Sequence, residues 1–297
     1  MRTAFIDELV TLAATHDNVA LIVGDLGYSV IEPFADRYPD RFINAGVAEQ
    51  NMTSLAAGMA SEGYHVFIYS IANFPTFRCA EQIRNDVAYH QLPVTIVTVG
   101  GGLAYGALGY SHHAVQDYAL IRCMPNMLIA APGDPMEARA CLRYLVNYPQ
   151  PSYLRLGRSG EPSFHPAPPT LVPGQWVKVS NSNENPPGCL LSTGATLGLA
   201  MESARSNKHY ENFDVYSLPL WGMSEKSSQT SQIESYAEVV SLEDHLVDGG
   251  FGSWLLESAE GAIRNRIQVR ALDPVVCGAV ASQGVLNVMG GIGSGLD

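Results

Sequence analysis

The chain alternates short apolar runs with amphipathic stretches, and this alternation limits the folds that it can adopt. Val, Ile and Leu dominate the apolar runs, which in the first half cover residues 19–24, 65–69, 93–99, 126–131 and 152–156. Helical periodicity lies between them, at residues 49–62, 80–90 and 135–146. Continuously apolar strands that alternate with helices are typical of a mostly parallel sheet covered on both faces. The first half is therefore predicted to have an α/β fold.

A proline-rich stretch interrupts this pattern at residues 161–174. Proline lacks a backbone N–H and continues neither a helix nor a central strand, so we expect a linker there. A second alternating series follows, with apolar runs at residues 189–192, 213–218, 239–242 and 267–272. The predicted organisation is a first α/β domain at residues 1–160, a linker at 161–174 and a second, smaller α/β domain at 175–297, each with a mostly parallel sheet covered by helices.

The composition excludes some classes of function. The formal net charge is −12, which argues against a general nucleic-acid-binding role because phosphate recognition needs clustered Lys and Arg. Hydrophobic residues make up 46% of the chain and charged residues 15%, as in a well-buried globular protein. A chain with so few charges often covers part of its surface with a partner, so we expect one here.

The five cysteines and the N-terminal sequence bear on the cellular compartment. The cysteines form no CxxC pair and lie among apolar neighbours, so we expect buried, reduced structural thiols. The first ten residues have helical periodicity and lack the apolar core of a signal peptide. No uninterrupted apolar run approaches the length of a membrane span. The predicted location is cytoplasmic.

Several short motifs carry the chemistry, and their order is more informative than any one of them. They read GDLG (24–27), NAGVAEQNM (44–52), FPTFRCAEQIRND (74–86), LGYSHHAVQD (108–117), YLRLGR (153–158) and SLEDHLVDGGFGS (241–253). Together they resemble the pyrimidine-binding and C-terminal domains of the transketolase family, and most of all those of split transketolases, whose two halves are separate chains. The resemblance implies thiamine diphosphate as the cofactor. It also implies Mg²⁺, with the diphosphate and metal ligands on a separate N-terminal subunit.

Glu49 matches the family's catalytic glutamate. The resemblance implies that its carboxyl group hydrogen-bonds a ring nitrogen of the aminopyrimidine, which then acts as the base toward the thiazolium C2 proton. By itself, Glu49 is also a first-turn acid favoured by the helix dipole. Phe74 matches the aromatic residue that packs on the pyrimidine, and Phe77 is a second candidate. Ile71 stands where related chains have another aromatic residue, so a partly aliphatic pocket is expected.

His112 matches a histidine that faces the substrate carbonyl in the family and exchanges a proton with the developing alkoxide. The neighbouring pattern departs from the family at two positions. Leu108 stands where the family has an acid, and Gly100 stands where it has a further substrate-contacting histidine. Both changes remove contacts to sugar hydroxyl groups, so the usual donor and acceptor sugars are not implied.

Arg158 matches the arginine that binds the substrate phosphate, a role that suits the bidentate guanidinium. Arg2 and Ser29 are expected as lesser contacts to the same phosphate, and Asp25 as a residue that holds the cofactor pocket. A surface ion pair is the alternative interpretation of Arg158.

The combined interpretation is a thiamine diphosphate-dependent transfer of a two-carbon ketol unit between sugars. This chain would be the C-terminal subunit of a split transketolase, active only with its N-terminal partner in a dimer of two-chain pairs. Two alternatives stay open. One is the beta subunit of a 2-oxoacid dehydrogenase, which shares the two-domain plan, and the other is a non-catalytic partner subunit.

Overall fold

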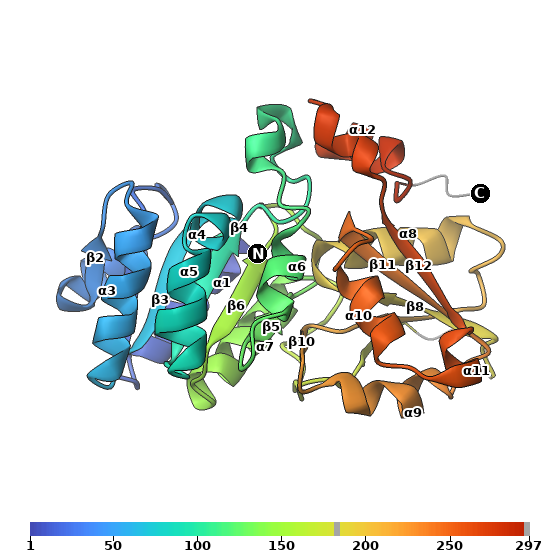
Figure 1. Ribbon diagram of the computed structural model, residues 1–297, viewed down its shortest axis with the longest axis horizontal. Coiled ribbons are helices and arrows are strands. Elements are labelled where there is room, and N and C mark those ends of the chain that lie inside the picture. Colours follow the sequence, from blue (N-terminus) through green and yellow to red (C-terminus); the bar gives the residue numbers. More distant parts are fainter. Residues whose placement is uncertain (181–184, 294–297) are drawn as a thin grey trace.

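The computed structural model describes residues 1–180 and 185–293, and these form two sheets flanked by helices (Figure 1). The first sheet has seven strands in the order β10-β5-β6-β4-β3-β1-β2. Its members are β1 (Val19–Val23), β2 (Phe42–Asn44), β3 (His65–Ile71), β4 (Val94–Val99), β5 (Leu128–Ala130), β6 (Ser152–Leu156) and β10 (Leu220–Gly222). Neighbouring strands are parallel except at β10, which is antiparallel to β5.

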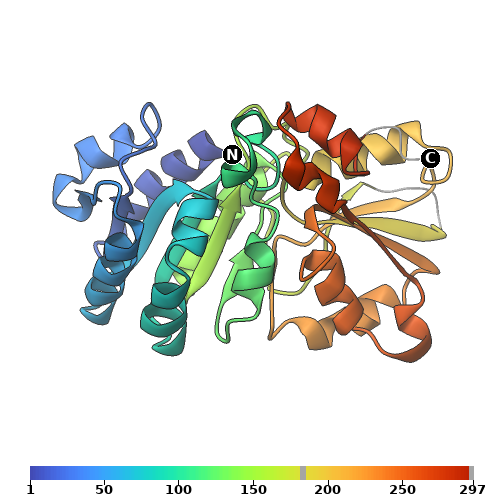
Figure 2. The same ribbon diagram turned by 45° about the horizontal axis from the view of Figure 1, so that its top comes forward.

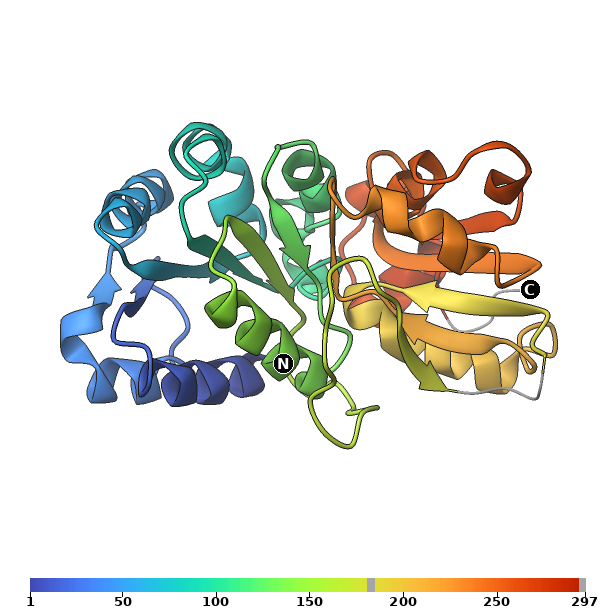
Figure 3. The same cartoon turned by 90° about the horizontal axis from the view of Figure 1, so that it is seen from below.

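Helices cover both faces of this sheet (Figure 3). In β1, Ile22 belongs to one apolar cluster, together with Met52 and Ala56 of α3 (Glu49–Ser61). Its neighbour Leu21 belongs to a second cluster, which contains residues of α1 (Arg2–Ala13) and α7 (Pro135–Asn147). Every residue of β1, β4 and β6 is buried, because side chains on both faces of a parallel sheet meet helices. This confirms the predicted α/β class.

The second sheet has five strands in the order β12-β11-β8-β9-β7. They are β7 (Val177–Ser180), β8 (Gly188–Ser192), β9 (Asp214–Ser217), β11 (Glu238–Leu246) and β12 (Ile267–Leu272), parallel except where β7 meets β9. The sequence pattern did not predict β7. It also did not predict β10, a short strand that belongs to the second half of the sequence but forms an edge of the first sheet.

The remaining α-helices lie between these strands, except α12, which follows the last one. They are α2 (Glu32–Arg37), α4 (Asn73–Phe77), α5 (Ala80–Gln82), α6 (Asp117–Arg122), α8 (Leu197–Ser206), α9 (Gln229–Ile233), α10 (Phe251–Glu257), α11 (Gly261–Arg264) and α12 (Gln283–Met289). The predicted helix at 80–90 is helical, but Ile83–Tyr89 wind as a π-helix. Asp134 caps α7, the predicted helix at 135–146, and accepts a 2.7 Å hydrogen bond from the backbone N–H of Glu137.

Two further expectations can be compared with the structure. Within the described residues no helix is long and apolar enough to cross a membrane. All five cysteines are free thiols, and Cys79, Cys141 and Cys189 are buried as predicted. The expectation of burial is wrong for Cys123, which is exposed at the C-terminal end of the short helix α6, and Cys277 is only partly buried.

A buried arginine, Arg155, joins the two sheets at the seam where they meet. Arg155 in β6 donates from Nε to Asp117 at 2.7 Å and from Nη1 to Asp244 in β11 at 2.5 Å. Its guanidinium carbon also lies 4.3 Å from the ring centroid of Tyr118. All four side chains are almost completely buried. Above this seam, α12 lies beside the loop that follows β4 (Figure 2).

Candidate functional site

The predicted site residues follow different strands of the first sheet, at the same edge. Asp25, Glu49, Phe74, His112 and Arg158 lie in the segments after β1, β2, β3, β4 and β6 respectively. Because the strands are parallel, their carboxyl ends share one edge. The strand order also reverses there, since β2 and β3 lie on opposite sides of β1. Such a reversal opens a crevice in which open α/β sheets bind ligands.

Glu49 is the first residue of α3, and its side chain is 4% exposed. It faces a hollow of about 490 Å³ lined also by Val47, Ala48, Gln50, Asn51 and Arg78. The helix begins there after a turn in which Gly46 has φ +69°, and Ala48 provides no side-chain cap. The free N–H groups of the first turn therefore favour a negative charge at this position.

Arg78 connects Glu49 to Phe74. Its Nη1 donates a 2.8 Å hydrogen bond to Oε1 of Glu49, and its guanidinium carbon lies 4.1 Å from the ring centroid of Phe74. Phe74 and Arg78 are four residues apart on one helical turn, which places their side chains on the same face. The sequence motifs assigned no role to Arg78. This i, i+4 spacing was the local signal that could have found it.

A second series of contacts leads from Phe74 to Arg158. The ring of Phe74 meets His112 edge to face at 5.3 Å, and His112 meets Tyr105 in the same way at 6.5 Å. The Arg158 guanidinium then lies 5.7 Å from the centroid of Tyr105. The structure thus joins four predicted residues, Glu49, Phe74, His112 and Arg158, through Arg78 and Tyr105.

His112 is half-buried, and its Nδ1 lies 3.0 Å from Oγ of Ser111. Burial lowers the pKa of His112, and the nearby charges of His113 and Arg78 lower it further. A neutral imidazole is therefore favoured, and a neutral imidazole both accepts and donates a proton. His113 by contrast is buried, with Nε2 3.2 Å from the carbonyl oxygen of Gly106, and has a structural role.

Tyr105 explains why residue 100 is glycine. Gly100 has φ +79°, and a Cβ atom there would overlap Cε2 of Tyr105. The tyrosine ring therefore occupies the space into which a longer side chain at position 100 would project. Tyr105 lies in a loop without periodicity, so the sequence offered no signal for this contact.

Arg158 and Arg2 lie at the same edge of the sheet. Arg158 is exposed, donates to the carbonyl oxygen of Ala104 at 3.2 Å and lines a hollow of about 260 Å³. Arg2 begins α1, and the preceding N-terminal amino group pairs at 2.7 Å with Glu161, three residues after Arg158. Within the described residues, Nε of Arg2 is buried without a hydrogen-bond partner. Both guanidinium groups thus keep donor capacity for an anion.

Asp25 and Ser29 lie in the exposed loop after β1, and both have positive φ. Hydrogen bonds from Asn44 and Tyr28, each 3.0 Å long, hold the pKa of the Asp25 carboxyl below its usual value. Asn44 also accepts from the N–H of Gly46, so Asp25 braces the turn that leads into Glu49. Ser29 donates through its backbone N–H to Glu32, which fixes this loop to the start of α2.

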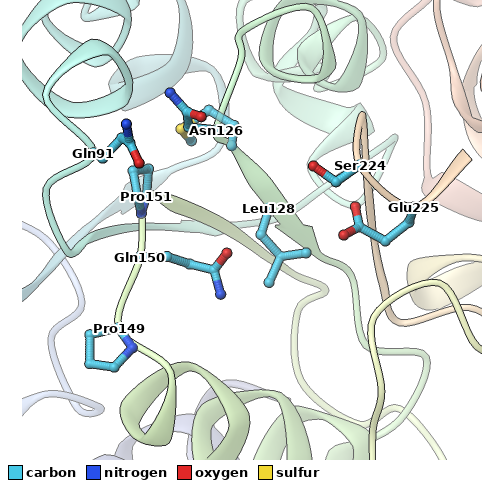
Figure 4. Close-up of a pocket in the computed structure, with 9 residues that line it drawn as sticks. Gln91, Asn126, Leu128, Pro149, Gln150, Pro151, Ser224 and Glu225 are labelled. Carbon is cyan, nitrogen blue, oxygen red and sulfur yellow. The ribbon is translucent and has the colours of Figure 1, made fainter.

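Phe77 and a second hollow do not belong to this group of contacting residues. Phe77 is 45% exposed, lies outside the aromatic series and does not line the hollow at Glu49. A different hollow, of about 270 Å³, lies at the opposite edge of the sheet. Residues before or at the start of β4, β5 and β6 form it together with Ser224 and Glu225 (Figure 4). It contains none of the predicted residues. In residues 1–180 and 185–293 no cluster of His, Cys, Asp and Glu could hold a metal ion.

Comparison with known proteins gives a consistent picture. Residues 1–162 match the family described as "Transketolase, pyrimidine binding domain". The chain is 39% identical over 165 residues to one of the subunits of apulose-4-phosphate transketolase from Phocaeicola vulgatus, covering 55% of this chain and 53% of that protein. It is 31% identical over 261 residues to 1-deoxy-D-xylulose-5-phosphate synthase of Clostridium perfringens, covering 86% of this chain and 41% of the synthase.

Among solved structures, the fold is similar to that of a split-gene transketolase described as an inactive beta4 tetramer. The TM-score is 0.82 at 27% identity, covering 98% of this chain and 93% of that one. The matched region spans about half the length of each of these two curated relatives.

Proposed function

We propose that this chain, which belongs to the transketolase family, is one subunit of a thiamine diphosphate-dependent enzyme that transfers a two-carbon ketol unit between sugars. The observation that carries the proposal is Glu49. Its carboxylate is buried, yet it borders an open hollow. The guanidinium of Arg78 lies between this carboxylate and the Phe74 ring and contacts both. A buried carboxylate beside an aromatic face is what an aminopyrimidine ring needs for its orientation and proton exchange.

The residues present fit such a ring. The guanidinium of Arg78 is planar and carries N–H donors at its edge, and in this position it both stacks near Phe74 and donates to Glu49. The space between Glu49 and Phe74 therefore accommodates a flat, nitrogen-rich group, here the guanidinium of Arg78. Bound there, thiamine diphosphate would supply an electron sink at its thiazolium C2 carbon.

The chain's own residues then have distinct roles. Glu49 shares a proton with the pyrimidine ring nitrogen, and Phe74 fixes the plane of the ring. The ring of His112 lies 5.3 Å from that of Phe74, where its neutral imidazole would face the reacting carbonyl group and pass a proton to or from the carbonyl oxygen. Arg158 binds the anionic end of the sugar, with Arg2 as the second cation and Tyr105 between His112 and Arg158.

The partner chain is part of the proposal. This chain provides the pyrimidine side of the site, so an N-terminal transketolase subunit would provide the diphosphate and Mg²⁺ ligands. Two relatives support this division, because one is named as a subunit of its transketolase and another is a split-gene transketolase whose beta tetramer is inactive. The proposed active form is a dimer of two-chain pairs, with each cofactor at a seam between the two kinds of chain.

Three other functions differ in what they require of the same residues or of a partner. One relative is a 1-deoxy-D-xylulose-5-phosphate synthase, and the role proposed for Glu49 would be the same in a synthase of that kind. A non-catalytic subunit would not require Glu49 to be buried at an open hollow. The beta subunit of a 2-oxoacid dehydrogenase would need a lipoyl-bearing partner.

Replacing Glu49 with Gln in the complex with the N-terminal subunit tests the proposal. Gln keeps the size of the side chain and its hydrogen bonding but cannot share a proton. Hydrogen–deuterium exchange at the cofactor's C2 position should slow by roughly 10²–10⁴-fold, the range usual for a lost acid–base group. Cofactor affinity, measured by calorimetry, should change much less, because the diphosphate contacts belong to the other chain.

The isolated chain is the control for the proposed requirement for a separate N-terminal subunit. It should bind thiamine diphosphate weakly and show no ketol transfer. Tight, Mg²⁺-dependent binding to the isolated chain would contradict the requirement for a partner. Exchange at the wild-type rate in the Glu49→Gln complex would show that Glu49 is not the activating acid.

A further inference from the structure

We propose that the guanidinium group of Arg78 occupies the place of the cofactor's aminopyrimidine ring, so that arginine and cofactor compete for Glu49 and Phe74. The inference rests on the proposed function and adds a residue that gates entry to the same site. Arg78 makes the two contacts that the ring would make, a hydrogen bond of 2.8 Å to Glu49 and a cation–π contact of 4.1 Å with Phe74. One planar group excludes the other from this position.

The chemistry of the two groups explains why one can replace the other. Both are flat, both donate N–H hydrogen bonds from an edge, and both place a π-face against an aromatic ring. Arg78 also lines the same hollow as Glu49, so its side chain already takes up part of the space at the carboxylate. A ring that bonds Glu49 must therefore move the arginine first.

The exposure of Arg78 shows that it can be moved. Its side chain is 47% exposed, whereas that of Glu49 is 4% exposed. Among the described residues the guanidinium makes one hydrogen bond, to Glu49. It follows the short helix α4, and turning toward solvent breaks this hydrogen bond and the contact with Phe74. Because Arg78 is half-exposed, solvent weakens both its ion pair and its cation–π contact, so the arginine delays the cofactor without blocking it.

Displacement of Arg78 also changes the acid–base group beside Phe74. The positive charge of Arg78 is one of the causes that lower the pKa of His112, after burial and the charge of His113. When the guanidinium leaves Glu49 and swings outward, this contribution weakens and the pKa of His112 rises toward its ordinary value. Cofactor entry at Glu49 and proton affinity at His112 are thereby coupled through one side chain.

The test measures binding of 4-amino-5-hydroxymethyl-2-methylpyrimidine, the free pyrimidine half of thiamine, to the full chain by titration calorimetry. The variant Arg78→Ala should bind this probe roughly 5–30-fold more tightly than wild type, because neither competing contact has to be broken. Arg84→Ala is the matched control, since Arg84 is an arginine in the next turn that donates only to its neighbour Asn85 among the described residues. It should bind like wild type.

A second measurement follows the His112 ring by NMR. Its pKa should be higher in Arg78→Ala than in wild type, and adding the probe to the wild-type chain should shift it in the same direction. Thermal unfolding of each variant establishes that the chain is folded during the titration.

The outcomes separate this inference from the proposed function. If Arg78→Ala binds no more tightly, while Phe74→Leu and Glu49→Gln bind more weakly than wild type, the competition is wrong and the cofactor site stands. If Phe74→Leu and Glu49→Gln leave probe binding unchanged, the site itself is wrong. Weaker binding to Arg78→Ala would show that the arginine holds the ring instead of competing with it.

Discussion

Arg155 and Arg78 both pair with carboxylates, but in opposite surroundings. Arg155 is almost completely buried and bonds Asp117 and Asp244, with Tyr118 against its guanidinium. Arg78 is half-exposed and makes one bond to Glu49. The first site is satisfied entirely within this chain, so it locks the two sheets together. The second leaves a buried carboxylate whose partner can be exchanged, which is the property of a binding site.

The largest effect is expected from Arg155→Met, which breaks the buried site. Asp117 and Asp244 would keep their buried positions without a counter-charge, and the free energy of unfolding should fall by about 3–5 kcal/mol. The matched change Arg78→Met removes a half-exposed partner and should cost about 0–1 kcal/mol. Urea unfolding with both variants measures the difference. Equal losses would show that the two arginines have the same structural role.

A third cluster, formed by His165, Asp134 and Glu137, pairs a histidine with two buried carboxyl groups. His165, in the predicted linker, lies 3.0 Å from Asp134, and its Nε2 is 3.8 Å from Glu137. Burial raises the pKa of Glu137 to about 7, and the hydrogen bond to Asp134 raises that of His165.

Both shifts make folding weaker as pH rises. The folded chain holds protons on Glu137 and His165 that the unfolded chain has released, so stability is greatest below the unfolded pKa values and is lost through the folded ones. We expect Glu137 to account for a loss on the order of 2 kcal/mol between about pH 5 and pH 8. Glu137→Gln should flatten the pH profile of urea unfolding. Parallel profiles for the variant and wild type would contradict the assignment.

Gly100→Ala tests the packing of Tyr105 beside the candidate functional site. A Cβ atom at position 100 would overlap the ring of Tyr105, and φ is +79° there, so a loss of about 1–2 kcal/mol is expected. Gly58→Ala in α3 is the matched control, because no atom lies within 4 Å of its added Cβ. It should stabilise the chain by about 0.5–1 kcal/mol. An unchanged unfolding midpoint for Gly100→Ala would show that Tyr105 is not held in place.

The smallest effect on stability is expected from Leu108→Asp, since this loop side chain is 58% exposed. Unfolding should change by less than about 0.5 kcal/mol. In the complex with the N-terminal subunit, an added carboxylate should raise kcat/KM for hydroxylated ketose phosphates, because it accepts from a hydroxyl group that leucine leaves unpaired. Unchanged kcat/KM across a panel of sugars would show that residue 108 does not face the substrate.

The sequence by itself determined the fold class and the order of the site residues along the chain. Continuously apolar runs such as 94–99 indicate strands that are buried on both faces, and Asp134 before Pro135 indicates a helix start. The position of Glu49 at the beginning of α3 was also predictable, because helix signals are local. The predicted domain boundaries remain a prediction, as do the roles of the site residues.

Only the tertiary structure decided which of these residues meet. Arg78 reaches Glu49 across 29 positions of sequence because β3 lies beside β1 on the side opposite β2, and Tyr105 fills the space above Gly100 through the course of a loop. The return of β10 to the first sheet is of the same kind. Local patterns reflect burial and backbone preference, whereas contacts between distant residues depend on strand order, which those patterns do not encode.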